Sequence, residues 1–351
     1  MESIDNKFIK KAKYQQKIDE STTQCLTCER RCKISNGKLG YCQTRINHEG
    51  TIYTIVYGCN AALSNNPIEK KPLYHFYPGS KALTIGSFGC NFDCFWCQNH
   101  QISHPERNMI EIMQSYEKYL SPEDFVKKAL NEKCQGTSIS FNEPTLLFEY
   151  ALEVFRLARE HGLYNTYITN GYMTENVLKD LIDAGLNAMN IDIKGNSEII
   201  KSQCGADVER IWRNAKLAKN LGIHLEITTL IIENLNSNPN IIKNISKRIK
   251  QELGEDTPFH ISRFYPQYKS NSKGYYKPTS LKLLFKAFDI AKSQGLNYVY
   301  LGNVSNNKYS STVCPSCSEI VLKRDFFTVT YKKIDKKGNC EFCGHKIAVN
   351  S

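Results

Sequence analysis

The chain of 351 residues contains no long apolar run. Its best stretch, residues 225–232, is less than half of the roughly 18 consecutive apolar residues that a membrane helix needs. Its beginning, Met-Glu-Ser-Ile-Asp-Asn-Lys, offers no apolar segment for a secretory signal. Glycine and proline are scarce at 20 and 11 residues, which excludes a collagen-like or low-complexity chain. We therefore expect a soluble, cytoplasmic protein without a membrane partner.

Hydrophobic and aromatic residues are plentiful, which excludes a disordered chain. They include 20 Tyr and 16 Phe within a hydrophobic fraction of 41%. The 46 Lys and Arg exceed the 35 Asp and Glu, so the net charge is +11. A basic surface can attract nucleic acid, but no aromatic residues are interleaved with the lysines for base stacking. A solvated lysine-rich surface is the simpler interpretation, and we do not expect nucleic acid as a partner.

Fourteen cysteines are the most informative feature of the sequence. The cytosol keeps thiols reduced, so metal or cluster ligation explains them better than a disulfide framework. Three stand apart, and we expect Cys59, Cys134 and Cys204 to be ordinary buried small side chains. The others form three groups: Cys25, Cys28, Cys32 and Cys42; Cys90, Cys94 and Cys97; and Cys314, Cys317, Cys340 and Cys343.

The middle of the chain predicts an α/β fold. Between residue 82 and about 304, short apolar strands alternate with helices, which is typical of βα units around a parallel sheet. Six or seven units can curl into a complete or partial barrel with catalytic groups on the loops after the strands. Before them we expect a charged helix over residues 3–20 and a strand at 51–57. The predicted strands are 82–88, 137–141, 165–169, 188–193, 224–232, 258–264 and 298–301, and the predicted helices are 121–132, 146–162, 174–185, 207–221, 240–253 and 279–294.

The cysteine groups at the two ends predict a module on each side of the barrel. We expect residues 1–80 to form a four-cysteine module and a bridging segment, residues 81–305 the barrel, and residues 306–351 a zinc-ribbon-like module. The two C-x2-C pairs of this last part are 22 residues apart, which fits tetrahedral Zn, with an auxiliary iron–sulfur cluster as the alternative. The first cysteine group fits either Zn or an auxiliary cluster.

The second cysteine group lies on the loop after the first predicted barrel strand. Three thiolates within eight residues suit an iron–sulfur cluster, and three ligands on four irons leave one iron open for a substrate or cofactor. The alternatives are an incomplete Zn knuckle or a chance group of core cysteines. The segment reads Gly-Cys-Asn-Phe-Asp-Cys-Phe-Trp-Cys from Gly89 to Cys97.

This C-x3-C-x2-C loop, with an aromatic residue before the last cysteine, resembles the radical S-adenosylmethionine (SAM) superfamily. The resemblance implies a partial (β/α)6 barrel and a [4Fe–4S] cluster on Cys90, Cys94 and Cys97 whose open iron chelates SAM. It also implies reductive cleavage of SAM to a 5′-deoxyadenosyl radical that abstracts hydrogen from a substrate.

Further residues resemble the family's SAM-binding positions. Glu143, in Phe-Asn-Glu-Pro where the family has Gly-Gly-Glu-Pro, is the candidate for the SAM amino group, or it only starts a helix. Asn170 lies in a Thr-Asn-Gly that resembles a SAM-contacting segment, although Asn before Gly is common in turns. Asp192 and Lys194 match the Asp-x-Lys of glycyl-radical activating enzymes and share one face of a strand, or they form a salt bridge at a sheet end.

Three more blocks resemble the radical SAM component of the AmmeMemoRadiSam system, whose relatives include pyruvate formate-lyase activating enzyme. This resemblance implies Memo-like and AMMECR-like partner proteins, and the chemistry implies an electron donor such as ferredoxin or flavodoxin. The blocks are residues 25–42, residues 67–80, and Ser262 to Pro266 with Gly302, Asn303 and Val304.

Four basic residues have two interpretations each. Lys70, Lys71 and His75 supply either an anion site near the barrel mouth or an ordered bridge between modules. Arg263 at a strand end binds a substrate carboxylate or phosphate, or forms a structural ion pair.

The leading hypothesis is an enzyme that uses a SAM-derived radical on a small molecule. Two alternatives remain at this point: a glycyl-radical-enzyme activase, and a zinc-ribbon protein that binds or modifies RNA.

Overall fold

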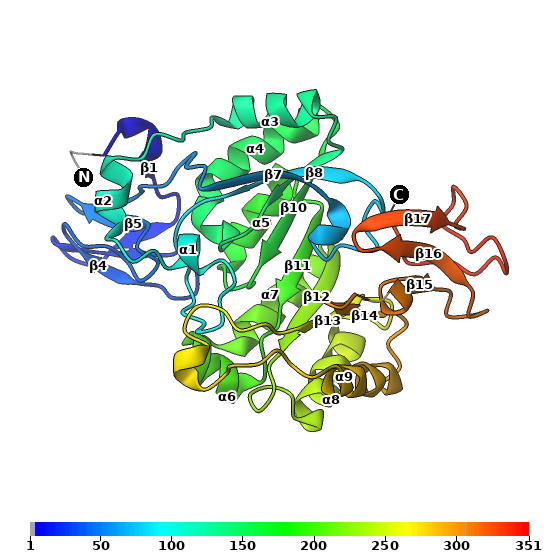
Figure 1. The fold of residues 1–351 in the computed structure, drawn as a ribbon. Coiled ribbons are helices and arrows are strands. Elements are labelled where there is room, and N and C mark those ends of the chain that lie inside the picture. Colours follow the sequence, from blue (N-terminus) through cyan, green and yellow to red (C-terminus); the bar gives the residue numbers. More distant parts are fainter. Residues whose placement is uncertain (1–3, 306, 351) are drawn as a thin grey trace.

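The computed structural model describes residues 4–305 and 307–350 and is built around one eight-stranded sheet (Figure 1). Seven strands, β8 to β14, run parallel in chain order, and β7 pairs antiparallel with β8 at the edge. Among the described residues β7 and β14 do not pair with each other, so the barrel is partial. The strands are β7 (Ala62–Pro67), β8 (Lys81–Gly86), β9 (Gly136–Ile139), β10 (Tyr164–Thr169), β11 (Ala188–Asp192), β12 (His224–Ile231), β13 (Phe259–Arg263) and β14 (Val299–Gly302).

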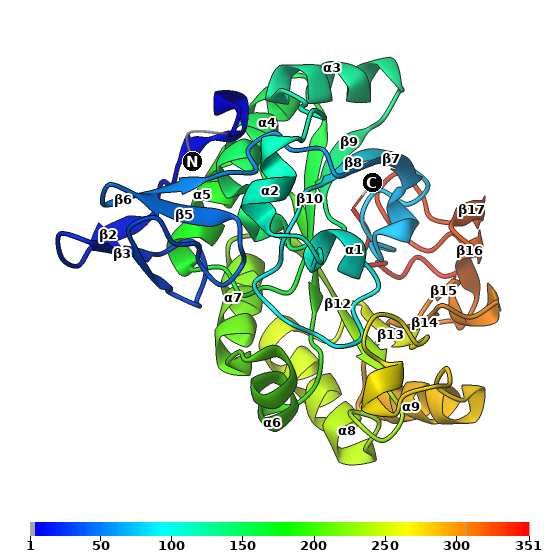
Figure 2. The ribbon, with the colours of Figure 1, turned by 60° about the vertical axis from the view of Figure 1, so that its left-hand side comes forward.

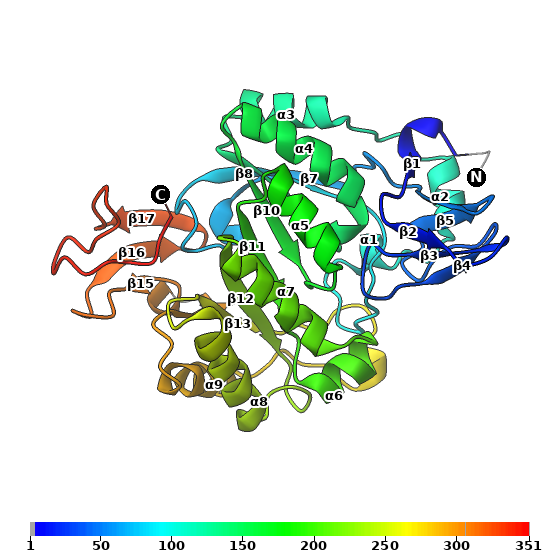
Figure 3. The ribbon, with the colours of Figure 1, turned by 180° about the vertical axis from the view of Figure 1, so that it is seen from behind.

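Six helices connect successive parallel strands and lie on the outer face of the sheet (Figure 3). They are α3 (Pro122–Asn131), α4 (Phe148–Glu160), α5 (Glu175–Ala184), α7 (Val208–Asn220), α8 (Pro239–Arg248) and α9 (Leu281–Ser293). Shorter helices are α1 (His100–Ser103), α2 (Met109–Gln114) and α6 (Ser197–Ile199). The predicted α/β partial barrel is therefore confirmed. None of the described helices is long and apolar enough to cross a bilayer.

Local signals explain why these elements begin and end where they do. The Ser121 hydroxyl accepts a hydrogen bond from the Asp124 amide at the start of α3, and Pro122 occupies the first turn. Gly185 ends α5 in the left-handed conformation at φ 118°. The predicted limits of these helices, 121–132 and 174–185, lie within a few residues of the observed ones.

The N-terminal region corrects one prediction. Over residues 3–20 there is no long helix in the described part; a 3₁₀ turn at Asn6–Phe8 is followed by short strands. The reason is tertiary pairing: β1 pairs with β6, and the Ala12 amide donates to the Ile52 carbonyl. The strands are β1 (Lys10–Lys11), β2 (Gln15–Lys17), β3 (Thr22–Cys25), β4 (Lys33–Ser35), β5 (Arg45–His48) and β6 (Thr51–Thr54).

A buried ion pair attaches this N-terminal region to the barrel. The Arg45 guanidinium donates to both carboxylate oxygens of Glu149 on α4 at 2.8 Å, and both side chains are buried. Figure 2 shows the N-terminal strands on the opposite side of the barrel from the C-terminal strands.

The C-terminal region is a three-stranded antiparallel sheet of β15 (Thr312–Val313), β16 (Ile320–Asp325) and β17 (Thr328–Lys332). Arg324 on β16, fully buried, attaches it to the barrel. Its guanidinium donates to the Tyr74 carbonyl at 2.5 Å and to the Thr312 hydroxyl at 2.9 Å, and it lies 3.7 Å from the Glu69 carboxylate.

The segment from Ile68 to Phe76 runs along the amino ends of the strands. The Tyr74 and His75 amides donate to the Glu226 carboxylate at 3.0 and 2.7 Å, near the start of β12. The Pro72 carbonyl accepts from Asn190 on β11. This segment therefore closes the end of the barrel opposite the loops on which catalytic groups are expected.

We predict that Arg324→Met destabilises the protein by roughly 3–5 kcal/mol, because it leaves the buried Glu69 carboxylate without its cation. The exposed neighbour Lys323 is the control, and Lys323→Met is expected to change the free energy of unfolding by less than about 0.5 kcal/mol. Equilibrium urea unfolding of both variants measures the difference. Equal losses in the two variants would contradict the role assigned to Arg324.

Candidate functional site

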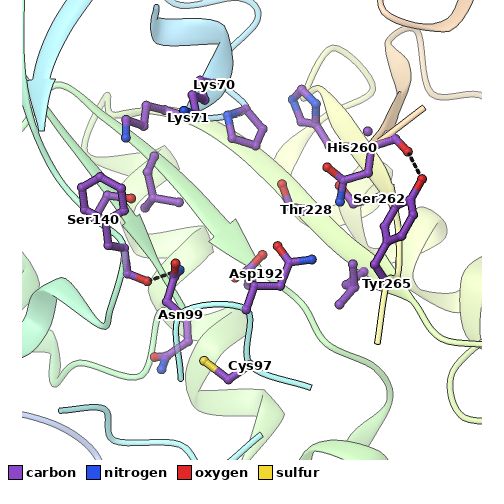
Figure 4. Close-up of a pocket in the computed structure, with 18 of the residues that line it drawn as sticks. Lys70, Lys71, Cys97, Asn99, Ser140, Asp192, Thr228, His260, Ser262 and Tyr265 are labelled. Carbon is purple, nitrogen blue, oxygen red and sulfur yellow. Dashed lines mark hydrogen bonds between the residues drawn. The ribbon is translucent and has the colours of Figure 1, made fainter. Parts of the chain in front are cut away.

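A cavity of about 830 Å³ lies inside the partial barrel (Figure 4). Its wall includes Cys90, Cys94 and Cys97 from the loop after β8, and Lys70 and Lys71 from the segment that closes the barrel. It also includes Glu143, Asn170, Asp192 and Lys194, so the cavity brings together the predicted residues of the barrel.

Asn142 positions the start of the cysteine loop. Its side-chain oxygen accepts from the Ser87 amide at 3.0 Å, and its nitrogen donates to the Phe88 and Gly89 carbonyls at 3.0 Å each. This residue stands at a position where the family has glycine. The sequence shows this asparagine as a difference from the family's Gly-Gly-Glu-Pro, but its role in holding the loop was not predicted. The polar residue directly before Glu-Pro was the one signal for that role.

Gly89 lets the loop approach the N-terminal region closely. Its φ is +82°, and a Cβ atom there would lie 2.5 Å from the Cys42 carbonyl oxygen. The cysteine loop and the four-cysteine region are therefore in direct contact.

The three loop cysteines lie at the cavity wall as partly or fully buried thiols. Burial raises the pKa of the Cys90 thiol well above its usual value and also raises that of Cys97. Cys204, which follows β11, is brought to 3.4 Å from Cys94, sulfur to sulfur. Sequence reasoning missed this contact, because no pattern links two cysteines that are 110 residues apart.

Glu143 is almost fully buried and its carboxylate is held by four hydrogen bonds. The Thr145 amide, the Thr145 hydroxyl and the Thr169 hydroxyl donate to one oxygen at 3.1, 2.5 and 2.6 Å, and the Asn170 amide donates to the other at 2.9 Å. Burial raises the pKa of Glu143 despite these donors. A carboxylate fixed in this way at a cavity wall suits the binding of an ammonium group.

Asn170 connects the cavity wall to the cysteine loop. Its side-chain nitrogen donates to the Asn91 side-chain oxygen at 2.7 Å, and its own oxygen accepts from the Tyr172 amide at 3.0 Å. The Asn91 side-chain nitrogen is buried and has no acceptor among the described residues. Asn170 therefore supports the loop as well as lining the cavity.

Asp192 and Lys194 both line the cavity and also bind each other, so the two interpretations of this pair coexist. The Lys194 ammonium lies 3.0 Å from a carboxylate oxygen of Asp192. Burial disfavours the charged lysine, but Asp192 and the nearby thiols Cys94 and Cys204 raise its pKa above the usual value. The pair therefore presents a fixed cation and anion at the end of β11.

The basic residues Lys70, Lys71 and His75 have two different roles. His75 is fully buried between Tyr300 and the Ala348 carbonyl, at 2.6 and 2.9 Å, and burial lowers its pKa to about 3. It is thus a neutral part of the bridge, whereas Lys70 and Lys71 line the cavity.

Arg263 does neither of the things expected of it: it donates to the Thr279 carbonyl at 2.7 Å and the Tyr265 hydroxyl at 3.1 Å, and it is not among the cavity-lining residues.

The two cysteine quartets differ in their spacing. All four sulfurs of the C-terminal quartet lie within 4.8 Å of one another, with pairs at 3.6 and 3.7 Å. A tetrahedral Zn with bonds of about 2.3 Å holds its sulfurs roughly 3.8 Å apart, so this quartet could hold Zn. The sulfurs of the N-terminal quartet do not gather in this way, although all four line one small cavity together with Arg30 and Asn91.

Comparison with known proteins decides the family. Residues 84–243 match the profile of the Radical SAM superfamily, a stretch that contains the cysteine loop, Glu143 and Lys194. A Methanocaldococcus jannaschii protein, provisionally named a glycyl-radical enzyme activating enzyme, is 30% identical over 64% of this chain and 80% of its own length. The chain belongs to the radical SAM superfamily. Superfamily members are enzymes, and membership implies a [4Fe–4S] cluster and SAM.

Two further proteins are similar to this chain. An uncharacterized protein of the same organism is 38% identical over 97% of this chain and 99% of its own length. Among solved structures, a domain of pyruvate-formate lyase-activating enzyme from Bacteroides vulgatus is 18% identical, with a TM-score of 0.41, over 48% of this chain and 99% of that domain.

We predict that Asn142→Ala loosens the cysteine loop, because it removes three hydrogen bonds to buried backbone groups. Amide hydrogen exchange over residues 87–99 is expected to accelerate, and the free energy of unfolding to fall by about 1–3 kcal/mol. Asn236→Ala is the matched control, since Asn236 also makes three backbone hydrogen bonds, but to Lys194, Leu230 and Ile232. Faster exchange over residues 87–99 in the control as well would refute a specific role for Asn142.

Proposed function

We propose that this chain cleaves SAM reductively at a [4Fe–4S] cluster held by Cys90, Cys94 and Cys97 and abstracts hydrogen from a small molecule. The observation that carries the proposal is the convergence of these three thiols, the Glu143 carboxylate and the Asp192–Lys194 pair on one cavity. The cysteines share one loop after the first parallel strand, and the other three residues come from the ends of β9 and β11.

The donor set fits the group. Three thiols can ligate three irons and leave the fourth open, and the Asn142 contacts hold the loop that carries them. When bound, this cofactor pair supplies one-electron cleavage of SAM to methionine and a 5′-deoxyadenosyl radical.

The protein's own residues bind SAM and orient it. Glu143, with its other contacts satisfied, accepts from the SAM ammonium. Lys194 offers a cation to the SAM carboxylate, and Asp192 and Asn170 offer hydrogen-bonding groups to the rest of the molecule.

The proposed partners come from the resemblance of three sequence blocks. Residues 25–42, residues 67–80, and Ser262 to Pro266 with Gly302, Asn303 and Val304 support an assignment to the AmmeMemoRadiSam system. We therefore propose Memo-like and AMMECR-like partners and a ferredoxin or flavodoxin as electron donor.

A glycyl-radical-enzyme activase is the second candidate function. It is favoured by the 30% identity to the Methanocaldococcus jannaschii relative named for that activity and by the Asp-x-Lys pair at the cavity. Incubation with a co-encoded glycyl-radical enzyme separates the two: a protein-based glycyl radical detected by electron paramagnetic resonance would favour the activase.

We predict that anaerobically reconstituted wild-type protein forms 5′-deoxyadenosine from SAM and a strong reductant, whereas Cys97→Ala falls to background because it removes a cluster ligand. Cys134→Ala is the matched control, since Cys134 is buried outside the cavity and should leave the activity within about twofold of wild type. Chromatographic quantification of 5′-deoxyadenosine gives the readout. Equal activity in the two variants would exclude the loop as the cluster site.

We propose different metals for the two quartets. Cys314, Cys317, Cys340 and Cys343 have the spacing of a tetrahedral Zn site. The sulfurs of Cys25, Cys28, Cys32 and Cys42 do not all lie within 4.8 Å of one another, which suits an iron–sulfur cluster, because each thiolate of a [4Fe–4S] cluster would bind a different iron. The Asn91 side-chain nitrogen beside this quartet has no acceptor among the described residues, and it could donate a hydrogen bond to such an anionic cluster.

We predict that a variant with Cys90, Cys94 and Cys97 all changed to Ala keeps about four irons per chain in the N-terminal quartet, and about one Zn in the C-terminal one. Metal analysis and Mössbauer spectroscopy of the anaerobic protein measure both. Cys317→Ala is expected to lose the Zn and keep the iron. An iron-free triple variant with two Zn would show that the N-terminal quartet is a Zn site.

A further inference from the structure

Lys71 is a buried lysine that faces the cavity without an anionic partner among the described residues. Only 4% of the residue is exposed, and no hydrogen bond or ion pair joins its ammonium to any described residue. The ammonium lies over the Phe141 ring, 4.6 Å from the ring centroid, a cation–π contact that offsets only part of the cost of burying the charge. A buried charge is ordinarily paired, so its lack of a partner calls for a ligand.

Four carboxylates line the cavity, those of Glu69, Glu143, Asp192 and Asp325, and none of them lies within ion-pair distance of Lys71. Asp192 binds Lys194, and Glu143 accepts from Thr145, Thr169 and Asn170. Glu69, next to this lysine pair in sequence, accepts from the Gly79 amide and lies beside Arg324. The acids described along the wall therefore leave Lys71 uncompensated.

The environment disfavours the charged form of Lys71. Burial, together with the smaller effect of the neighbouring Lys70, lowers the pKa of Lys71 to about 7. An anion in the cavity would restore the charge interactions that burial removes. The Thr228 hydroxyl, which is buried at the same cavity and has no partner among the described residues, is a further donor.

Figure 4 shows Lys70 and Lys71 on the opposite side of the cavity from Cys97, with Asp192 between them. The cluster and SAM belong to the Cys97 side under the proposed function. Lys71 thus faces the part of the cavity left for the molecule that loses a hydrogen.

We propose that Lys71 binds a carboxylate or phosphate group of the substrate, so that the substrate is an anionic small molecule. This inference rests on the proposed function for the identity of the bound molecule, whereas the anion site itself can be tested without SAM cleavage.

The experiment measures reductive methylation of lysines in the anaerobically reconstituted wild-type protein, with inorganic phosphate or acetate as the probe. Peptide mass spectrometry gives the methylation rate of Lys71 relative to Lys70, an exposed amine on the same peptide that serves as internal control. At twice its dissociation constant, a bound anion should lower this ratio about threefold. Chloride at the same ionic strength should leave it unchanged. Protection by phosphate alone points to a phosphorylated substrate, and protection by acetate alone points to a carboxylate.

Three results would overturn the inference. They are no protection of Lys71 by either anion, equal protection of Lys70 and Lys71 so that their ratio stays unchanged, and complete protection of Lys71 by SAM alone, which would assign the lysine to the SAM carboxylate. The rate of 5′-deoxyadenosine formation in the absence of substrate is compared between Lys71→Met and Lys70→Met. Loss of this activity in Lys71→Met alone would again assign Lys71 to SAM.

The two proposals fail separately. If an anion protects Lys71 in a protein that forms no 5′-deoxyadenosine, the anion site is supported and the proposed radical chemistry is contradicted. Normal 5′-deoxyadenosine formation without protection would remove only the anionic substrate.

Discussion

The Glu226 carboxylate is the buried group on which the closed end of the barrel depends. It is fully buried and accepts from the Tyr74 and His75 amides, and it contacts the rings of His224 and His260 at 2.9 and 2.6 Å. Burial alone would raise its pKa, but the two histidines lower it well below the usual range, so the carboxylate stays ionised. A charge satisfied from four directions has one low-energy arrangement. That arrangement places the Ile68 to Phe76 segment, and with it Lys71 at the cavity and the Tyr74 carbonyl that binds Arg324.

Arg30 performs a similar function at the other end of the barrel. Its guanidinium donates to the Asn91 carbonyl and the Cys204 carbonyl, both at 2.7 Å, and packs on the Tyr41 ring at 3.7 Å. It lies between Cys28 and Cys32, so the N-terminal quartet is connected to the loops that carry Cys94 and Cys204. The Arg30 hydrogen bonds therefore join the N-terminal quartet to the cysteine loop and to the loop that carries Cys204. This connection gives a physical reason for the four-cysteine region to lie against the loop rather than on a separate tether.

The sequence predicted best where local signals and tertiary packing agree. The parallel strands are short, apolar and bounded by capped helices, so their positions came out within a few residues, and the C-x3-C-x2-C loop already resembled the family to which the chain belongs. The helix predicted over residues 3–20 was wrong because the helical preference of this charged segment is weaker than the pairing of β1 with β6. Edge strand β7 was missed, since Ala-Leu-Ser-Asn-Asn-Pro has the composition of a turn and becomes a strand only through β8. The Cys94–Cys204 contact and the role of Asn142 depend on the fold and have no short-range pattern.

The contrast between His75 and Lys71 shows how buried polar groups separate scaffold from site. The two residues lie four positions apart in one basic block, and both are almost fully buried. Every nitrogen of the His75 ring has a partner, and its pKa of about 3 keeps it neutral, so nothing remains for a ligand to satisfy. By contrast, the Thr228 hydroxyl is buried at the cavity wall without a partner among the described residues, and the Lys71 ammonium forms neither a hydrogen bond nor an ion pair there. Burial and missing partners thus separate Lys71 from His75 more clearly than the charge pattern of the sequence does, and they are the observations on which the proposed anion site rests.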